Sequence, residues 1–190
     1  MPIVMFIGKN VKEYKEKSAE VIKCAISGGR LLCSVCLSPL RRHSEYERKI
    51  KESGEPISIT IVWCRACREF HALLPDFLLP RKHYSGNEIE GVMIEIGATG
   101  VSQTDTYASE STVRRWVKQV GEGVRRAVSR LKVRFGRAGR AVSEVAIEAG
   151  GAYEELEQIL EMAPCAVESS GNRLGLANLW LGTEGPAEYI

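Results

Sequence analysis

Residues 31–37 read LLCSVCL and residues 62–68 read VWCRACR, so each stretch carries two cysteines separated by two residues. Two such pairs are compatible with a redox switch, with two disulfides, or with the four ligands of one metal ion. The 27 residues between the pairs are enough for one β-hairpin, which would bring the pairs together. We therefore expect a β-hairpin ribbon that closes a four-sulfur site, the arrangement typical of structural zinc.

The predicted ligands of one structural Zn²⁺ are Cys33, Cys36, Cys64 and Cys67. Rubredoxin-type iron is the alternative metal, because four thiolates also suit iron. Disulfides are disfavoured in a reducing cytosol, and a thioredoxin-like site needs a single pair at the start of a helix, whereas both pairs here adjoin predicted strands. Because four cysteines leave no open coordination position, we predict that the metal is structural and that the protein is not an enzyme.

Four further residues bear on this prediction. His43 and His71 flank the pairs and are interpreted as polar strand residues, with replacement of a cysteine ligand as the alternative for either. Cys24 and Cys165 have no partner at metal-binding spacing, and we expect them to be small buried residues.

The pattern along the chain predicts an α+β protein. A β-prone start leads into a helix from Val11, ended by Gly28 and Gly29, and strands HSEYERKIK and ISITIVW flank the turn ESGEP. EFHALL is a candidate third strand, and Ser85 with Glu88 forms a capping box for the next helix. The predicted fold is an N-terminal four-cysteine zinc ribbon built on a β-hairpin, then an all-α helix-turn-helix region, then C-terminal helices.

Five regions are predicted in chain order. They are 1–29, an N-terminal strand and helix; 30–74, the four-cysteine zinc ribbon; 75–84, a linker; 85–136, a helix-turn-helix DNA-binding region with a basic helix; and 137–190, an acidic helical region and tail.

Charge is unevenly distributed, although the net charge is only +2. Residues 112–140 contain ten Arg or Lys and one acid, whereas residues 141–190 contain nine Glu and one base. A concentrated basic block is the electrostatic footprint of a phosphate-binding surface. The alternative is a solvated helix face that the acidic tail neutralises by folding back.

The stretch ASESTVRRWVKQV, residues 108–120, has the layout of a recognition helix. Ser109 is a good N-cap, and Val113, Trp116, Val117 and Val120 form the expected buried stripe. A second basic helix, VRRAVSRLKVRF, is expected directly after it. The residues predicted to contact DNA are Ser111, Thr112, Arg114, Arg115, Lys118, Arg125, Arg126 and Arg130. An ordinary amphipathic surface helix is the alternative interpretation.

The order of a four-cysteine ribbon, HALLPDFLLPRKHYS and YASESTVRRW resembles a bacterial group of insertion-sequence-associated proteins, described as transposase-related or of unknown function. The resemblance covers roughly residues 30–120 and extends more weakly to LGLANLWLG. It implies zinc ligation by the four cysteines and DNA contact by Ser111, Thr112, Arg114 and Arg115. Transposases of this kind cut DNA with three acidic residues. This chain has only two Asp, Asp76 and Asp105, so we expect no nuclease domain.

Together these features predict a zinc-stabilised, non-catalytic DNA-binding protein of a mobile element, either an end-binding accessory factor or a transcriptional regulator. Double-stranded DNA is the expected partner, and a transposase or a second copy of the chain are further candidates. The alternative is a protein-interaction module that binds a transposase or a transcription component through the ribbon and the acidic C-terminal region. No membrane-spanning stretch or secretory leader is evident, so we expect a cytoplasmic protein without a membrane partner.

Overall fold

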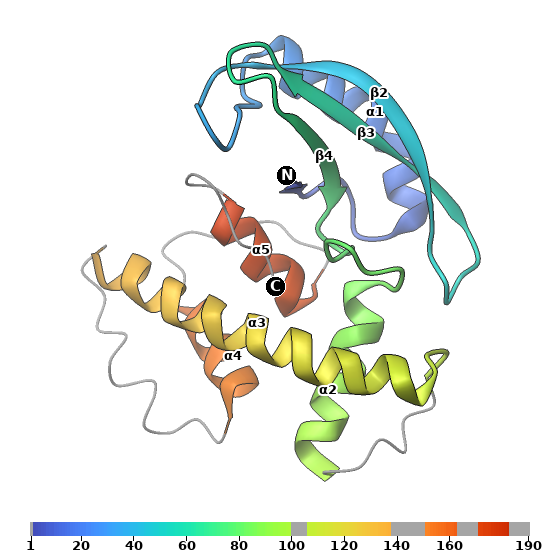
Figure 1. Ribbon diagram of the computed structural model, residues 1–190, viewed down its shortest axis with the longest axis vertical. Helices are drawn as coiled ribbons and strands as arrows, with labels where there is room; N and C mark the ends of the chain where they lie inside the picture. Colours follow the sequence, from blue (N-terminus) through green and yellow to red (C-terminus); the bar gives the residue numbers. More distant parts are fainter. Residues whose placement is uncertain (1, 100–105, 138–150, 163–170, 183–190) are drawn as a thin grey trace.

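The computed structural model describes residues 2–99, 106–137, 151–162 and 171–182. The protein is a mixed α+β fold with a four-stranded sheet and five helices in these residues (Figure 1). The elements are β1 (Ile3–Met5), α1 (Val11–Ser27), β2 (Leu40–Lys49), β3 (Pro56–Cys64), β4 (Phe70–Pro75), α2 (Gly86–Thr99), α3 (Glu110–Arg137), α4 (Ala152–Glu161) and α5 (Arg173–Gly182).

The sheet has the strand order β1-β4-β3-β2. β2 and β3 form the predicted antiparallel hairpin, with a register shift between Arg42 and Ser44. β4 is the predicted third strand and pairs antiparallel with β3, while the short β1 adds to β4 in parallel. The alternation of side chains in β3 buries Ile57 and Ile59 on the face that α1 covers.

Helix α1 begins and ends where the sequence predicts. The side chain of Asn10 accepts a hydrogen bond from the Glu13 N–H at 3.0 Å, and Gly28 is the C-cap. Its inner face docks on the hairpin through the buried Tyr14, whose hydroxyl donates to the Ser58 carbonyl at 2.7 Å. Cys24 is exposed on the opposite face, so the expectation of a buried residue is wrong, whereas Cys165 lies outside the described residues.

Buried side chains form two separate clusters. One lies between the sheet and α1 and extends from Ile7 to Leu78; the other lies among α2, α3, α4 and α5 and begins at Leu79. We call residues 2–78 the sheet half and the described residues from 79 to 182 the helical half. The segment predicted as a linker contributes to both, because Leu78 and Leu79 are fully buried in different clusters. The division of the chain into five regions stays a prediction.

Helix α3 corrects the sequence-based prediction of two basic helices. It runs without interruption from Glu110 to Arg137 through Gly121 and Gly123. Each glycine in a helix interior costs about 1 kcal/mol, but Val120 and Val124 on either side of Gly121 are fully buried and hold the helix together there. Val117 was expected in the buried stripe and is instead 40% exposed.

The relation between α2 and α3 decides whether a helix-turn-helix is present. Ser85 caps α2 as expected, since its hydroxyl accepts from the Glu88 N–H at 3.2 Å. Residues 100–105, which lie between α2 and α3, are outside the described residues, and the helix-turn-helix is not shown. The apolar stretch RLGLANLWLG forms α5 and places Leu174, Ala177 and Trp180 in the helical core.

No helix among the described residues combines the length and the apolar character needed to cross a membrane.

Candidate metal centre

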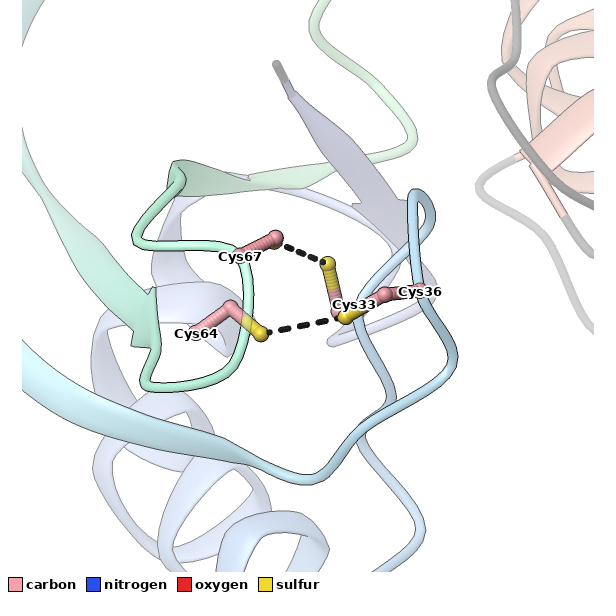
Figure 2. A group of neighbouring side chains, drawn as sticks. All are labelled: Cys33, Cys36, Cys64 and Cys67. Atoms are coloured by element: carbon pink, nitrogen blue, oxygen red, sulfur yellow. Dashed lines mark hydrogen bonds between the residues drawn. The ribbon is translucent and has the colours of Figure 1, made fainter.

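Two turns at one end of the sheet carry the four cysteines (Figure 2). Cys33 and Cys36 lie in the turn that precedes β2, which is closed by a bridge between Leu32 and Pro39. Cys64 is the last residue of β3, and Cys67 lies in the turn into β4. The β2–β3 hairpin therefore returns the chain to the first turn, as the hairpin-sized gap between the pairs predicts.

The four sulfurs lie within 4.8 Å of one another. Cys33 Sγ is 3.5 Å from Cys67 Sγ, and Cys36 Sγ is 3.4 Å from Cys64 Sγ. Sulfurs bound to one tetrahedral zinc at about 2.3 Å lie about 3.8 Å apart, so the cluster has the dimensions of a four-thiolate metal site. All four thiols are free, and no disulfide links them.

The two turns share a left-handed backbone conformation that the sequence analysis did not predict. The residue after the second cysteine of each pair, Leu37 in one turn and Arg68 in the other, has a positive φ of 59° and 61° respectively. In the first turn the Leu37 N–H donates to the Cys33 carbonyl at 2.9 Å, and the Val35 N–H points at the Cys33 sulfur at 3.4 Å. Both turns thus present a pair of thiols in the same local geometry. Glycine usually occupies such left-handed positions, so these two turns carry backbone strain.

The surroundings of the four thiols differ. Cys33 and Cys64 are fully buried, while Cys36 is exposed. Hydrogen bonds from Ser38 lower the pKa of Cys36 to about 6, and loss of hydration raises the pKa of Cys67 to about 12. A bound metal cation reverses the second effect, because coordination deprotonates a thiol.

His71 contributes a contact that sequence reasoning did not assign. It lies on β4, is fully buried, and places its Nε2 3.3 Å from Cys33 Sγ. With the proton on Nε2, this is an N–H···S hydrogen bond that stabilises a thiolate and orients it, as outer groups do around metal ligands. His43, by contrast, sits beside Ser44 and packs edge-on against Phe70. The sequence feature that could have pointed to this contact is the position of His71 seven residues after Cys64, in the strand that follows the second turn.

The donor set fits one metal ion. Four soft sulfur donors at tetrahedral dimensions suit zinc or iron, and two of them are removed from solvent on the hydrophobic core of the sheet half. An ion bound by these four sulfurs would join the turn before β2 to the turn after β3. With an ion bound, the cysteine cluster would cross-link the two turns of the sheet half.

The residues predicted to contact DNA lie on α3, away from the cysteines in the chain, and most are exposed. Ser111, Arg114, Arg115, Lys118, Arg125, Arg126 and Arg130 are exposed, and Thr112 is half-buried. Arg114 pairs with Glu110 at 2.5 Å. The Ser109 hydroxyl lies 3.2 Å from that of Ser111 and 2.9 Å from that of Thr112, so these hydroxyls bond to one another at the start of the helix.

Residues 33–116 match the model of a protein family described as a domain of unknown function, DUF6431. The match begins at the first cysteine of the cluster, includes all four, and ends within the first turns of α3, before Arg125, Arg126 and Arg130. No curated protein and no solved structure matches the chain.

Proposed function

We propose that the protein is a non-catalytic DNA-binding protein whose sheet half is stabilised by one structural Zn²⁺ at the four cysteines. The metal would act as a cross-link, since a closed four-thiolate site supports folding and leaves no position for substrate. DNA would contact the exposed basic side of α3. The proposal of a mobile-element role rests only on the resemblance of HALLPDFLLP and YASESTVRRW.

One observation carries the proposal: the basic residues of α3 divide into two sets. Lys132 faces inward and pairs with Glu155 of α4, so part of the basic block is neutralised within the fold. Arg125 and Arg126 point to solvent and form no ion pair with a carboxylate in the described ranges. Internal neutralisation therefore accounts for Lys132 and leaves an outward set that is suited to an external polyanion.

The continuous helix is long enough to lie along several base pairs of a duplex. From Arg114 to Arg130 the rise is about 24 Å at 1.5 Å per residue, which is the span of about seven base pairs at 3.4 Å each. Exposed Arg and Lys side chains recur over this span, and Glu122 is the one acidic residue within it. Such a row is suited to phosphate contacts, while Ser111, Thr112 and Arg114 at the start of the helix are the candidates for base contacts.

The test measures the binding of the zinc-loaded protein to a fluorescein-labelled 30-base-pair duplex by fluorescence anisotropy over a series of salt concentrations. We expect the affinity to fall steeply with salt. Replacing Arg125 and Arg126 by Ala should weaken binding and reduce the salt slope by about 2. The matched control replaces Lys12 and Lys23, two exposed bases on α1, and should leave the slope nearly unchanged.

Absence of binding at low salt with zinc present would refute the DNA proposal. Equal losses in both double variants would instead show that only net charge matters. The alternative proposal is a protein-interaction module that uses the cysteine ribbon and the acidic C-terminal region, with a transposase, a transcription component or a second copy of the chain as partner. It predicts that a partner protein binds equally well to the Arg125→Ala, Arg126→Ala variant.

A further inference from the structure

A small pocket lies where the sheet half meets the start of α3. Its volume is about 140 Å³. Three segments that are far apart in the sequence line it: Lys51 from the β2–β3 turn, Arg81 and Lys82 from the segment before α2, and Arg115 from α3. Four permanent or near-permanent cations thus converge on one pocket, and among the residues that the structure describes no carboxylate lines it.

None of these four cations forms an ion pair with a carboxylate in the part of the chain that the structure describes. Lys82 Nζ donates instead to Gln119 Oε1 at 2.7 Å, and Arg115 reaches only the Thr112 hydroxyl at 3.5 Å. Partial burial, followed by the positive charge of Arg115, lowers the pKa of Lys82. Within the described residues, the pocket therefore holds like charges together without a compensating anion.

The wall of the pocket is rigid. Tyr84 and Trp116 are both buried and meet edge to face, with ring centroids 4.9 Å apart. Lys51 Nζ lies 5.6 Å from the Tyr84 ring centre, and the Lys51 N–H donates to the His83 carbonyl at 2.9 Å. These contacts fix the β2–β3 turn against the segment that carries Arg81 and Lys82. The cations are thus set on a preformed surface, which reduces the entropy cost of binding.

Two further features bear on whether the pocket can bind an anion. Arg81 adopts a positive φ of 60°, a left-handed conformation that is unfavourable for a non-glycine residue and that recurs at ligand sites. The acid nearest to Lys51 in sequence, Glu52, is already occupied, because its Oε1 accepts the Ser85 N–H at 2.6 Å at the start of α2. Glu52 is therefore directed at α2 and does not line the pocket.

We propose that the pocket formed by Lys51, Arg81, Lys82 and Arg115 binds one phosphate group. Arginine offers paired donors that match two phosphate oxygens, and lysine adds point charges. The pocket adjoins Arg115 at the start of α3, so under the proposed function, on which this choice of source rests, the group is a backbone phosphodiester of duplex DNA. The other source of the same chemistry is free phosphate. Lys51, Arg81 and Lys82, which lie outside α3, would join Arg115 of α3 in holding the duplex.

The first experiment titrates inorganic phosphate into the zinc-loaded, ¹⁵N-labelled full chain at constant ionic strength, with chloride as the balancing anion, and follows amide shifts by NMR. We expect saturable shifts at Lys51, Lys82 and Arg115. The shifts should be lost in Lys51→Ala, Arg81→Ala. They should persist in the matched control Arg41→Ala, Lys49→Ala, which removes one Arg and one Lys that are exposed on β2 of the same hairpin.

The second experiment measures duplex binding by the same two double variants. Because a hydrogen bond to a charged group contributes about 1.5–3 kcal/mol, losing even one phosphate contact should weaken duplex binding by about tenfold or more in Lys51→Ala, Arg81→Ala. The control variant should change the affinity by less than about twofold beyond the general effect of charge. An unchanged zinc content and unchanged far-UV circular dichroism would confirm that each variant folds.

The outcomes separate this proposal from the proposed function. If duplex DNA binds and depends on Arg125 and Arg126, but Lys51→Ala, Arg81→Ala behaves like its control in both experiments, the phosphate pocket is refuted and DNA binding stands. If duplex DNA does not bind, but phosphate saturates the pocket in the wild type and the control variant and not in Lys51→Ala, Arg81→Ala, DNA binding is refuted and free phosphate is the source. Non-saturable shifts, or equal shifts in both variants, would overturn the pocket.

Discussion

The two halves of the molecule are held together by different means. In the sheet half, four cysteines from two turns converge at one end of a small sheet, and a single helix covers one face. In the helical half, α3 provides a long apolar face on which α2, α4 and α5 pack, and ion pairs join the helices. A metal ion at the cysteine cluster would add a cross-link to the core of the sheet half, as metal sites do in small domains.

The largest expected effect tests the sheet half. Replacing Cys64 by Ser removes a buried ligand, and structural zinc contributes about 10–16 kcal/mol to the folding of small zinc domains. We expect the variant to lose its zinc and the near-ultraviolet circular dichroism of Trp63, which lies next to the cluster on β3. Elemental analysis of the purified protein gives the zinc content.

Cys24→Ser is the matched control for this change. Cys24 is exposed on α1, outside the cluster, so one zinc per chain and an unchanged Tm are expected. A Cys64→Ser protein that keeps both zinc and the wild-type Tm would contradict the assigned role of the cluster.

The second-largest expected effect tests the helical half through Glu90, which lies outside the cysteine cluster. Glu90 on α2 is nearly buried, and its carboxylate accepts the N–H groups of Arg173 and Leu174 at the start of α5 and the guanidinium of Arg173 at 2.9 Å. Glu90→Gln should lower the free energy of unfolding by about 2–3 kcal/mol, measured by urea denaturation. Zinc content should stay at one per chain. Glu122→Gln, on the exposed side of α3, is the control and should change stability by less than about 0.5 kcal/mol.

The third prediction concerns alkaline pH in the sheet half. Burial raises the pKa of Tyr14 to about 12 from its ordinary value of 10.0. The folded protein thus holds the phenolic proton more tightly than the unfolded chain, so the stabilising contribution is complete below pH 10 and is lost as pH rises from 10 to 12. Tyr14→Phe should cost about 1 kcal/mol at neutral pH through the lost hydrogen bond to Ser58 and should remove this alkaline decline.

Denaturation curves at pH 7, 9, 10 and 11 compare the Tyr14→Phe variant with the wild type. The gap between the two proteins should narrow above pH 10. A gap that stays constant across this range would show that Tyr14 does not govern the alkaline behaviour of the sheet half.

The smallest effect tests the backbone of the cysteine turns. Leu37 holds a positive φ that costs about 1–2 kcal/mol. Leu37→Gly relieves this strain but increases the entropy of the unfolded chain by about 0.5–1 kcal/mol. We therefore expect a net gain in stability between zero and about 1.5 kcal/mol, the difference between these two effects. Leu37→Val should destabilise the zinc-loaded protein, because a β-branched residue is least tolerated at positive φ; equal stability of the two variants would contradict this.

Local patterns in the sequence predicted the sheet half well. Cysteine spacing, the Gly/Pro turn and the alternation of ISITIVW all act within a few residues, so the hairpin and the meeting of the four thiols follow from them. The parallel pairing of β1 with β4 was not predicted. Partners about 70 residues apart, such as Ile3 and Leu73, leave no local signature.

The helical half was predicted less completely for the same reason. The helix predicted over VRRAVSRLKVRF was correct, but its continuity with the preceding helix through Gly121 was missed because tertiary packing outweighs the intrinsic penalty of glycine. The convergence of Lys51, Arg81 and Arg115 was also missed, since it depends on how three distant segments pack. For α3, exposure agrees with the prediction at Arg125 and Arg126, while contact with DNA stays a prediction.

The parallel strand β1 has a consequence for the order of folding. It can pair only after β4 exists, and it also contacts α5, which lies more than 160 residues further along the chain. Contacts between residues so distant in sequence are slow to form because the loop must close first. The hairpin and its cysteine turns need only local contacts. We expect the metal cluster to form early and β1 to dock last, so protection of the Val4 amide from hydrogen exchange should appear late in refolding.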